Sequence, residues 1–358
     1  MEGESQALGT EARTLAEVFA AAGFETASFT SGLELNPRLG ASGWERGCEH
    51  AEYRFGDTAT LALCEEWLAG RSDARPLFLW IHLSGCDPPH DPRAVPPRPD
   101  RTLGAFDYAR LFTDPAYAGP ADGSLAYLAA AGTGTATLGP ADRQHLIDLY
   151  DGEVARLASG LRSFLLFASN VVPAGGERDL LADSVLVFAG LTGLELGEHG
   201  RSLGSAGSLF LPVMRVPFFV RHPGSLTGSR ILSEPVELAD VAPTLCEWFD
   251  LAPPSALPDP QSGARAGRSL LPLVDSYLKR PFEPRPAMAL CTTPARAAVL
   301  RTREWCLLWS TAGGAQGPAL FDRTRDQDEL YDVSSSHPDV VARLWPELER
   351  ALAQAGWR

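Results

Sequence analysis

Lysine is almost missing from this sequence of 358 residues: Lys279 is the single one, and arginine carries the other fixed positive charges. Basic residues of both kinds are outnumbered, 31 against 45 acidic ones, which gives a formal net charge of -14. A protein that binds nucleic acid or an anionic membrane surface needs a cationic face. The composition therefore argues against both kinds of partner.

Long apolar runs are missing as well. The first residues, MEGESQALGTEAR, are acidic and polar and lack the apolar core of a secretory signal. No later run reaches the roughly 20 apolar residues of a membrane helix. As encoded, the chain is expected in the cytoplasm, with no membrane partner.

Paired cysteines are a third absence. The six cysteines stand singly along the chain, and no two of them form a C-x-x-C motif. In a chain of this length, such spacing favours small core residues and free thiols over a disulfide framework or a zinc site.

Helix-like and strand-like patterns alternate through most of the chain, whose 45% apolar content is ample for a packed core. Residues 76–83, PLFLWIHL, form a continuously apolar run typical of a parallel strand buried on both faces. Between residues 86 and 139 the sequence is rich in Pro, Gly, Ala and Asp, and an irregular surface segment is expected. The other expected elements are helices at 15–22, 57–70 (capped by Asp57), 140–167 and 237–251, and strands at 25–31, 184–191 and 216–221.

This alternation predicts an α/β fold, with a mainly parallel central sheet flanked by helices. Beyond about residue 281 the character changes, and short strand-like runs predict a small antiparallel sheet followed by a helix from Pro338 to about Ala355. We therefore expect two domains: an α/β domain over 1–280 and a C-terminal α+β subdomain over 281–358.

A Gly-rich loop follows the expected strand at 184–191, and chemistry is expected there because catalytic groups of open α/β sheets lie just beyond strand ends. The loop carries Glu195, Glu198 and His199. Directly after the strand, however, stand Leu191 and Thr192, which are poor catalytic groups.

Seven segments carry a family resemblance through their order and spacing. They are TLAEVFAAAGFETASF, PLFLWIHL with a following PPHDP, LYDGEVARL, DSVLVFAG with LGEHG, RVPFFVRHPG, ELADVAPTL and LFDRTRDQDELYDV. Together they resemble the sulfatase family of the alkaline-phosphatase superfamily, over nearly the whole chain.

The resemblance implies metal-dependent hydrolysis of sulfate or phosphate esters. Family members hold a divalent metal, usually calcium, with paired aspartates after the first strand and an Asp with a His or Asn after a later one. Their nucleophile is a formylglycine made from Cys or Ser within C/S-x-P-S-R. The metal neutralises the ester oxygens while the hydrated aldehyde attacks.

The chain departs from this pattern at the later metal ligands. Where the family typically reads S-D-H-G-E before L-G-E-H-G, residues 190–194 read GLTGL. Leu191 offers no ligand atom and Thr192 a weak one, whereas calcium prefers carboxylate and carbonyl oxygens. The basic residue usually found before the next strand aligns with Ser205 or Ala206. No metal and no other cofactor are therefore predicted.

The start of the chain departs as well, because the family's aspartate strand and nucleophile precede the helix that begins here near Arg13. Residues 291–296, CTTPAR, resemble the nucleophile motif, but Pro and Arg stand one residue too late and in the wrong region. The sequence thus predicts an N-terminal truncation. Loss of a central strand would favour self-association or aggregation.

Some site-like residues survive. His90 in PPHDP matches the family histidine that approaches the substrate, and His199 is a second vestigial catalytic candidate, with Glu198 a candidate for substrate binding. The alternatives are a surface-loop imidazole for His90 and hydrogen bonds that order a Gly-rich turn for the LGEHG pair. His82 is interpreted as a hydrogen-bonded core histidine and 322–332 as a solvated acidic loop.

These departures predict a catalytically inactive sulfatase-like protein with a binding or regulatory role, whose partner is a second copy or an active sulfatase-like relative. The alternative is a fragment or subunit of a metal-dependent sulfuric-ester or phosphoric-ester hydrolase. Its nucleophile and first metal ligands would then lie outside this chain. A third hypothesis is that the chain is a decaying gene product without a selected role.

Overall fold

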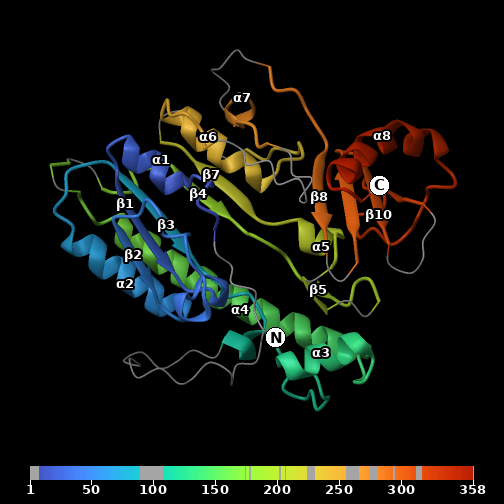
Figure 1. The fold of residues 1–358 in the computed structure, drawn as a ribbon. Helices are drawn as coiled ribbons and strands as arrows, with labels where there is room; N and C mark the ends of the chain where they lie inside the picture. The colour runs from blue at the N-terminus through green and yellow to red at the C-terminus, as the bar shows by residue number, and fades with distance from the viewer. Residues whose placement is uncertain are drawn as a thin grey trace. The chain divides into compact units, whose positions relative to one another are not determined.

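The computed structural model describes residues 8–88, 108–173, 175–176, 179–200, 203–205, 207–223, 230–254, 266–274, 281–292, 295–311 and 317–357. The chain divides into two compact units, unit 1 (Met1–Val185) and unit 2 (Leu186–Arg358), which Figure 1 colours from blue to red along the sequence. The domain boundary expected near residue 280 is a different division and stays a prediction.

Unit 1 contains a three-stranded parallel sheet. β1 (Glu25–Thr30) is the central strand and is hydrogen-bonded to β2 (His50–Tyr53) on one side and to β3 (Leu77–His82) on the other. The strands expected at 25–31 and 76–83 are confirmed. Because all three strands run in the same direction, their carboxyl ends meet at one edge of the sheet.

The helix α1 (Leu15–Ala21) precedes β1, and its first turn follows from local sequence alone. Thr14 Oγ1 accepts a hydrogen bond from Glu17 N at 3.0 Å, while Thr14 N donates to Glu17 Oε2 at 2.7 Å. This capping box satisfies two backbone N–H groups. Gly23, with a φ of 86°, follows the helix in the left-handed conformation that glycine adopts readily.

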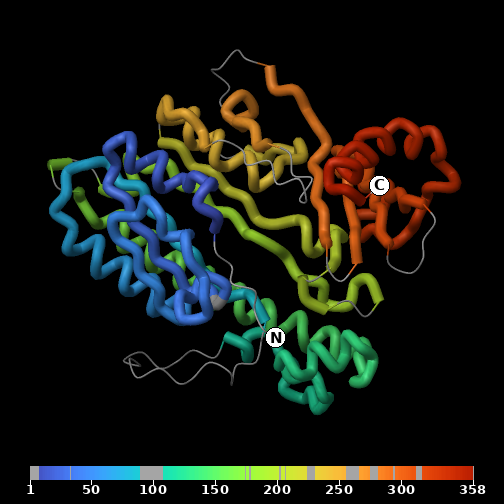
Figure 2. Tube along the Cα trace, in the orientation of Figure 1, coloured from blue at the N-terminus to red at the C-terminus, as the bar shows by residue number. Residues whose placement is uncertain are grey.

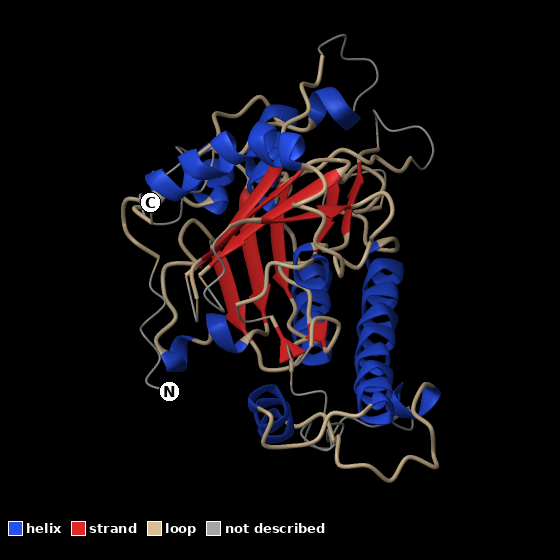
Figure 3. Ribbon diagram, turned by 90° about the vertical axis from the view of Figure 1, so that its right-hand side faces the viewer, coloured by secondary structure: helices blue, strands red, loops and turns tan. Residues whose placement is uncertain are grey.

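Two longer helices, α2 (Asp57–Gly70) and α4 (Pro140–Ala168), pack against the sheet (Figure 2). The second is the long helix in Figure 3. The buried side chains that β1, α2 and α4 contribute to this core are Ala27, Phe29, Leu61, Cys64, Leu68 and Phe164. On the opposite face of the sheet, the Phe78 ring of β3 stacks on Phe19 of α1 at a centroid distance of 4.7 Å, so β3 is covered on both faces, as its apolar run predicts.

The segment expected to be irregular contains a further helix, α3 (Leu125–Thr133), whose N-cap Ser124 accepts a hydrogen bond from Tyr127 N at 3.1 Å. The prediction of an irregular segment was wrong here. Alanine fills much of the helix, so its buried side, Tyr127, Leu128 and Ala131, gives little apolar periodicity. Short 3-10 helices complete the unit: η1 (Leu33–Leu35), η2 (Pro37–Leu39) and η3 (Tyr108–Leu111).

Unit 2 begins with β4 (Leu186–Ala189), which pairs antiparallel with β7 (Phe218–Arg221). Both strands lie inside the ranges expected for them and are shorter. The intervening chain forms a two-stranded hairpin, β5 (Glu195–Leu196) with β6 (Leu203–Gly204), and then α5 (Leu211–Met214).

The helix expected at 237–251 is present as η4 (Leu238–Asp240) followed by α6 (Val241–Trp248). Pro243 lies in the first turn of α6, where a missing N–H costs no intrahelical hydrogen bond. A short helix, α7 (Leu271–Val274), comes next along the described chain.

The C-terminal part forms an antiparallel sheet in the order β11-β10-β9-β8. Its strands are β8 (Ala287–Cys291), β9 (Ala297–Arg301), β10 (Trp305–Ser310) and β11 (Ala319–Asp322), and α8 (Pro338–Gln354) packs on it. The small antiparallel sheet and the final helix are therefore as expected.

Two further sequence expectations concern the whole chain. The six cysteines are free thiols. Among the residues that the structure describes, no helix combines the length and apolar character needed to cross a membrane.

Candidate functional site

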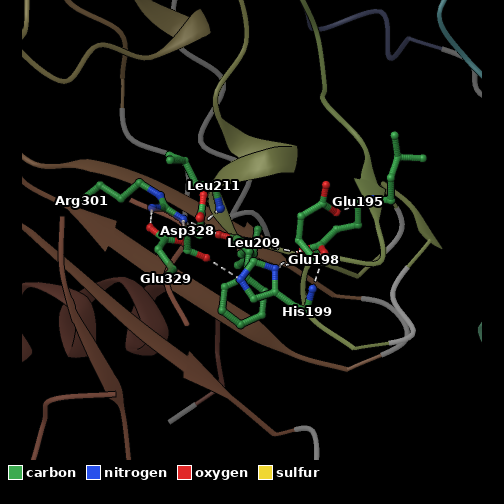
Figure 4. Close-up of polar contacts among 11 residues, drawn as sticks. Glu195, Glu198, His199, Leu209, Leu211, Arg301, Asp328 and Glu329 are labelled. Atoms are coloured by element: carbon green, nitrogen blue, oxygen red, sulfur yellow. Dashed lines mark hydrogen bonds and ion pairs between the residues drawn. The ribbon is translucent and has the colours of Figure 1, made fainter. Parts of the chain in front are cut away.

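His199, the described one of the two catalytic candidates, lies in the turn between β5 and β6 and is held on three sides (Figure 4). Its Nδ1 is 3.0 Å from Glu195 Oε1, and its Nε2 is 2.8 Å from the backbone oxygen of Asp328. Its ring stacks on Phe210 at a centroid distance of 3.7 Å. The imidazole thus ties this turn to the loop after β11.

Both ring nitrogens of His199 face oxygen atoms. A carbonyl oxygen accepts hydrogen bonds, so Nε2 must donate to Asp328. Nδ1 must then either donate to a Glu195 carboxylate or accept from a protonated Glu195. Either way, the pair shares a proton in a closed network.

Glu195 and Glu198 have different roles in this turn. Glu195 is fully buried (0% exposed) and also accepts from Ser208 Oγ at 2.7 Å. Glu198 Oε2 accepts a hydrogen bond from Leu196 N at 2.5 Å, which shapes the turn locally. The substrate-binding role considered for Glu198 stays a prediction.

A buried ion pair lies next to this network. Arg301 Nη2 donates to Glu329 Oε2 at 3.0 Å and to Leu209 O at 2.6 Å, and Arg301 Nη1 also contacts Glu329. Glu329 Oε2 accepts from Leu211 N at 2.9 Å. Buried charges persist when they are paired in this way.

The ion pair corrects the interpretation of 322–332 as a solvated acidic loop. Glu329 is among the most deeply buried side chains described, and it adopts a positive φ of 55°. The sequence pattern misled because an acidic, turn-rich run is solvated by default, and its buried arginine partner is 28 residues away in the chain. Beside the pair, a shallow hollow of about 220 Å³ is lined by Leu211, Pro212, Arg215, Gln327 and Asp328.

The end of β4 is where the family would place its later metal ligands, and the residues there do not fit a calcium ion. Leu191 is 64% exposed and has no ligand atom. The Thr192 hydroxyl donates to the neighbouring carbonyl of Gly193 at 3.2 Å. Within the described ranges, no group of three or more His, Cys, Asp or Glu side chains is arranged to hold a metal. No reaction step is therefore assigned to a metal here.

Two of the positions singled out from the sequence lie wholly or partly outside the described residues. His90 lies outside the described residues. In GSAG, Ser205 is described and partly buried, whereas Ala206 lies outside the described residues.

His82, at the carboxyl end of β3, has a carboxylate partner. Its Nε2 is 2.5 Å from Glu34 Oε1, which confirms the interpretation of a hydrogen-bonded buried histidine. The partner could not be read from the sequence, because Glu34 lies 48 residues earlier, in the short helix that follows β1.

Asp57 is a site-like residue that sequence reasoning assigned wrongly. The N-cap of α2 is Gly56, and Asp57 turns its side chain to the strand ends instead of capping. Its Oδ1 accepts from Ser31 Oγ at 2.8 Å and from Ser84 N at 3.1 Å. The cap prediction failed because these partners come from the ends of β1 and β3, which only the sheet brings together.

A cation completes the surroundings of Asp57. Arg156 of α4 lies 3.4 Å from Asp57 Oδ2 and 2.8 Å from Glu153 Oε2. Gly85 is required beside them, because a Cβ at this position would clash with the Asp57 carboxylate. Asp57 is thus a neutralised structural anchor at the edge of the sheet.

The turn after β3 contains two groups whose pKa values rise. Burial raises the pKa of Cys86 to about 11, and the charges of Glu153 and Asp57 add to the effect. Burial, and then the neighbouring Glu34 charge, raise the pKa of Asp87. The Cys86 thiol is therefore a poor nucleophile near neutral pH.

This α/β architecture, with its small C-terminal antiparallel sheet, is shared with solved sulfatase structures. A 2-O GAG sulfatase matches with a TM-score of 0.69 at 16% identity, over 98% of this chain and 76% of that one. A protein solved with its substrate D-glucosamine-2-N,6-O-disulfate matches with a TM-score of 0.64 at 17% identity, over 96% and 82% of the two chains. The fold class predicted from sequence is confirmed.

Sequence relatives agree with the fold. Arylsulfatase K of Danio rerio is 33% identical over 142 residues, which are 38% of this chain and 25% of the relative. Arylsulfatase K of Homo sapiens is 28% identical over 190 residues, 51% of this chain and 33% of the relative. The chain therefore covers about a third or less of the length of these relatives. No protein-family model matches it.

Taken together, the relatives and the fold show that the chain is similar to proteins of the sulfatase family. The resemblance inferred from its seven segments is confirmed.

Proposed function

We propose that this sulfatase-family chain does not hydrolyse sulfate esters and acts through binding, as a regulatory partner of an active relative or of a second copy. The single observation that carries the proposal is the end of β4. Leu191 and Thr192 stand there in place of metal ligands, and the Thr192 hydroxyl is turned to Gly193 O.

The physical argument is the ligand demand of the metal. Calcium takes six to eight oxygen ligands, and catalysis depends on the charge that it places against the ester oxygens. A leucine side chain cannot replace a carboxylate, so the site would lose both charge and a ligand atom. Esters of sulfate would then lack their main electrostatic stabilisation in the transition state.

The state of His199 supports the same proposal. A general acid or base needs a ring nitrogen within reach of the substrate proton. In His199 one nitrogen is engaged by Glu195 and the other by Asp328, and the ring face is covered by Phe210. This geometry favours a structural role for His199, in holding two loops together, over a role in proton transfer.

The test is turnover of p-nitrophenyl sulfate and of a p-nitrophenyl phosphodiester, measured with and without added CaCl2. We expect the uncatalysed rate in both conditions, and no calorimetric signal of stoichiometric calcium binding. An active arylsulfatase in the same buffers is the positive control. Metal-dependent turnover that disappears in His90→Ala would overturn the proposal.

The alternative function is a subunit or fragment of a metal-dependent ester hydrolase whose nucleophile and first ligands lie on other residues. The observation in its favour is that the chain covers about a quarter to a third of the curated relatives. The coding DNA before Met1 tests it: an in-frame strand ending in paired aspartates, followed by C/S-x-P-S-R, would support this alternative. Leu191 would still leave the later half of the metal site incomplete.

A further inference from the structure

The carboxyl ends of β1, β2 and β3 bring three polar side chains into one row on one face of the sheet. Thr30 is in register with Tyr53 of β2 and with His82 of β3. In a parallel sheet, residues in register point to the same face. Ligands of α/β proteins bind at this edge, beyond the carboxyl ends of the strands.

Two members of the row have hydroxyl groups with no hydrogen-bond partner. Thr30 is 0% exposed, and its Oγ1 is unpartnered. The buried hydroxyl of Tyr53 is unpartnered as well. A buried hydroxyl without a partner is unfavourable, because it has lost its hydrogen bonds to water and has gained none in the fold. Two of them in one row indicate that a polar group belongs between them.

Two carboxylates border the same row. Glu34 Oε1 is 2.5 Å from His82 Nε2, and the Glu34 side chain is 40% exposed, so the end of the row at Glu34 is open to solvent. Asp87 is half-buried, and no described residue donates a hydrogen bond to its carboxylate. Burial and the Glu34 charge raise the Asp87 pKa, and they raise that of Tyr53 in the same way.

Charge is therefore unbalanced at this edge. The nearby guanidinium of Arg156 is engaged by Asp57 and Glu153. His82 is the group that the structure places against Glu34, and one imidazole cannot neutralise two carboxylates. An added cation would relieve the repulsion between Glu34 and Asp87.

Glycine makes the arrangement possible. A Cβ at position 32 would clash with Glu34 Oε1, so a larger residue there would displace the Glu34 carboxylate from His82. On the same face, the Trp80 ring meets the His82 ring edge-on at a centroid distance of 6.0 Å. The row thus has an aromatic wall, which favours organic cations.

We propose that Thr30, Glu34, Tyr53, His82 and Asp87 form a binding site for the ammonium group of a small organic amine. An ammonium group has three N–H donors. The row and the two carboxylates that border it offer two carboxylate groups and two hydroxyl oxygens as acceptors. A sulfate ester would meet two like charges and is disfavoured. A metal ion is disfavoured too, because the described residues include no metal-binding group of three such side chains.

The proposal does not depend on whether the chain hydrolyses esters. It concerns a ligand of opposite charge to a sulfate ester, and its test measures binding.

The experiment is a titration of the full chain, labelled with 15N-histidine, with n-butylammonium chloride. The His82 ring signals, assigned with His82→Asn, are the readout. We expect them to shift in a saturable manner, while equal concentrations of 1-butanol or NaCl leave them unchanged. An equal response to 1-butanol would overturn the proposal. Tighter, competitive binding of CaCl2 would overturn it as well, in favour of a metal site.

Three variants test which residues hold the amine. Glu34→Gln and Asp87→Asn each remove one charge-assisted hydrogen bond, so we expect about tenfold to hundredfold weaker binding. Gly32→Ala should weaken binding by displacing Glu34 while leaving the charge unchanged. Glu66→Gln, the same change at an exposed position of α2, is the matched control and should bind as the parent does.

Thermal unfolding of each variant separates lost binding from lost folding, since Glu34 is partly exposed and its replacement should leave the melting temperature nearly unchanged. If Glu34→Gln and Gly32→Ala fold and bind n-butylammonium as tightly as Glu66→Gln does, the site is wrong. A lysine side chain carries the same ammonium group. Tighter binding of Nα-acetyl-lysine amide than of n-butylammonium would therefore assign the ligand to a peptide, and weaker binding would assign it to a free amine.

Discussion

His82 in unit 1 and His199 in unit 2 look alike as residues. Each side chain is 10% exposed, and each lies within hydrogen-bond distance of a glutamate. They differ in what surrounds them. Both nitrogens of His199 are engaged and its ring is stacked. His82 is in register with Thr30, and the hydroxyls of Thr30 and of Tyr53, on the next strand, are unpartnered. Residue type and burial are therefore the same for the two histidines, and it is the presence of polar groups without hydrogen-bond partners that distinguishes the proposed binding site.

The largest effect is expected from breaking the buried ion pair behind His199. Glu329→Ala leaves Arg301 buried without its carboxylate, which should lower the free energy of unfolding by about 3–5 kcal/mol. Urea unfolding followed by far-UV circular dichroism measures it. The control is Asp328→Asn, an exposed neighbour whose backbone carbonyl still serves His199, with an expected change within about 0.5 kcal/mol. Equal effects of the two variants would show that the ion pair adds no stability.

A smaller effect is expected at the anchor of the unit 1 strand ends. Asp57→Ala leaves the Ser31 hydroxyl and the Ser84 N–H without their acceptor, so a loss of about 2–3 kcal/mol is expected. Asp57→Asn keeps an oxygen acceptor at the same place and should cost clearly less. The same urea experiment compares them. If alanine and asparagine are equally tolerated, these hydrogen bonds do not hold the edge together.

The two histidines themselves can be compared directly. His199→Phe keeps a ring over Phe210 but removes the hydrogen bonds to Glu195 and Asp328, for an expected loss of about 1–2 kcal/mol. His82→Phe removes one contact, to the partly exposed Glu34, and should cost less. Thermal melts of both variants give the order. A larger loss for His82→Phe would mean that the unit 1 edge is the more tightly built of the two.

The smallest effect is chemical. Burial raises the pKa of Cys86 to about 11 in the folded chain, against an ordinary thiol value of 9.0. This predicts labelling by iodoacetamide at pH 8 that is about a hundredfold slower than in the urea-unfolded chain. Mass spectrometry of the Cys86 peptide measures both rates.

The sign of the linked stability follows from the same shift. The fold favours the neutral thiol, so this contribution is fully present below pH 9 and is lost as the pH rises through about 11. Equal labelling rates in the folded and unfolded chains would show that the thiol is not held in a buried environment.

Local sequence was sufficient for most of the fold. The capping box at Thr14, the apolar run of β3 and the apolar stripe of α8 each specify an element through contacts close in the chain. α3 was missed because alanine blurs the helical period. That Leu191 and Thr192 stand where the family resemblance implies metal ligands could also be predicted from the sequence, since it depends on residue identity alone.

The interaction partners of the charged residues could not be predicted from the sequence. Asp57 looked like a helix cap, and Glu329 looked solvated, because a sequence shows which residues carry charge but not which distant group neutralises it. The Glu34–His82 contact spans 48 residues and the Arg301–Glu329 pair spans 28. Each pair meets only after strands and loops have folded.

The sequence by itself determined the sulfatase-like fold and the presence of Leu191 and Thr192 directly after β4, because both follow from residue type in order along the chain. Tertiary structure alone decided that His199 is locked in a closed network and that Thr30, Tyr53 and His82 share one row. The physical reason is that strand register and long-range burial set which polar groups find partners and which remain unsatisfied.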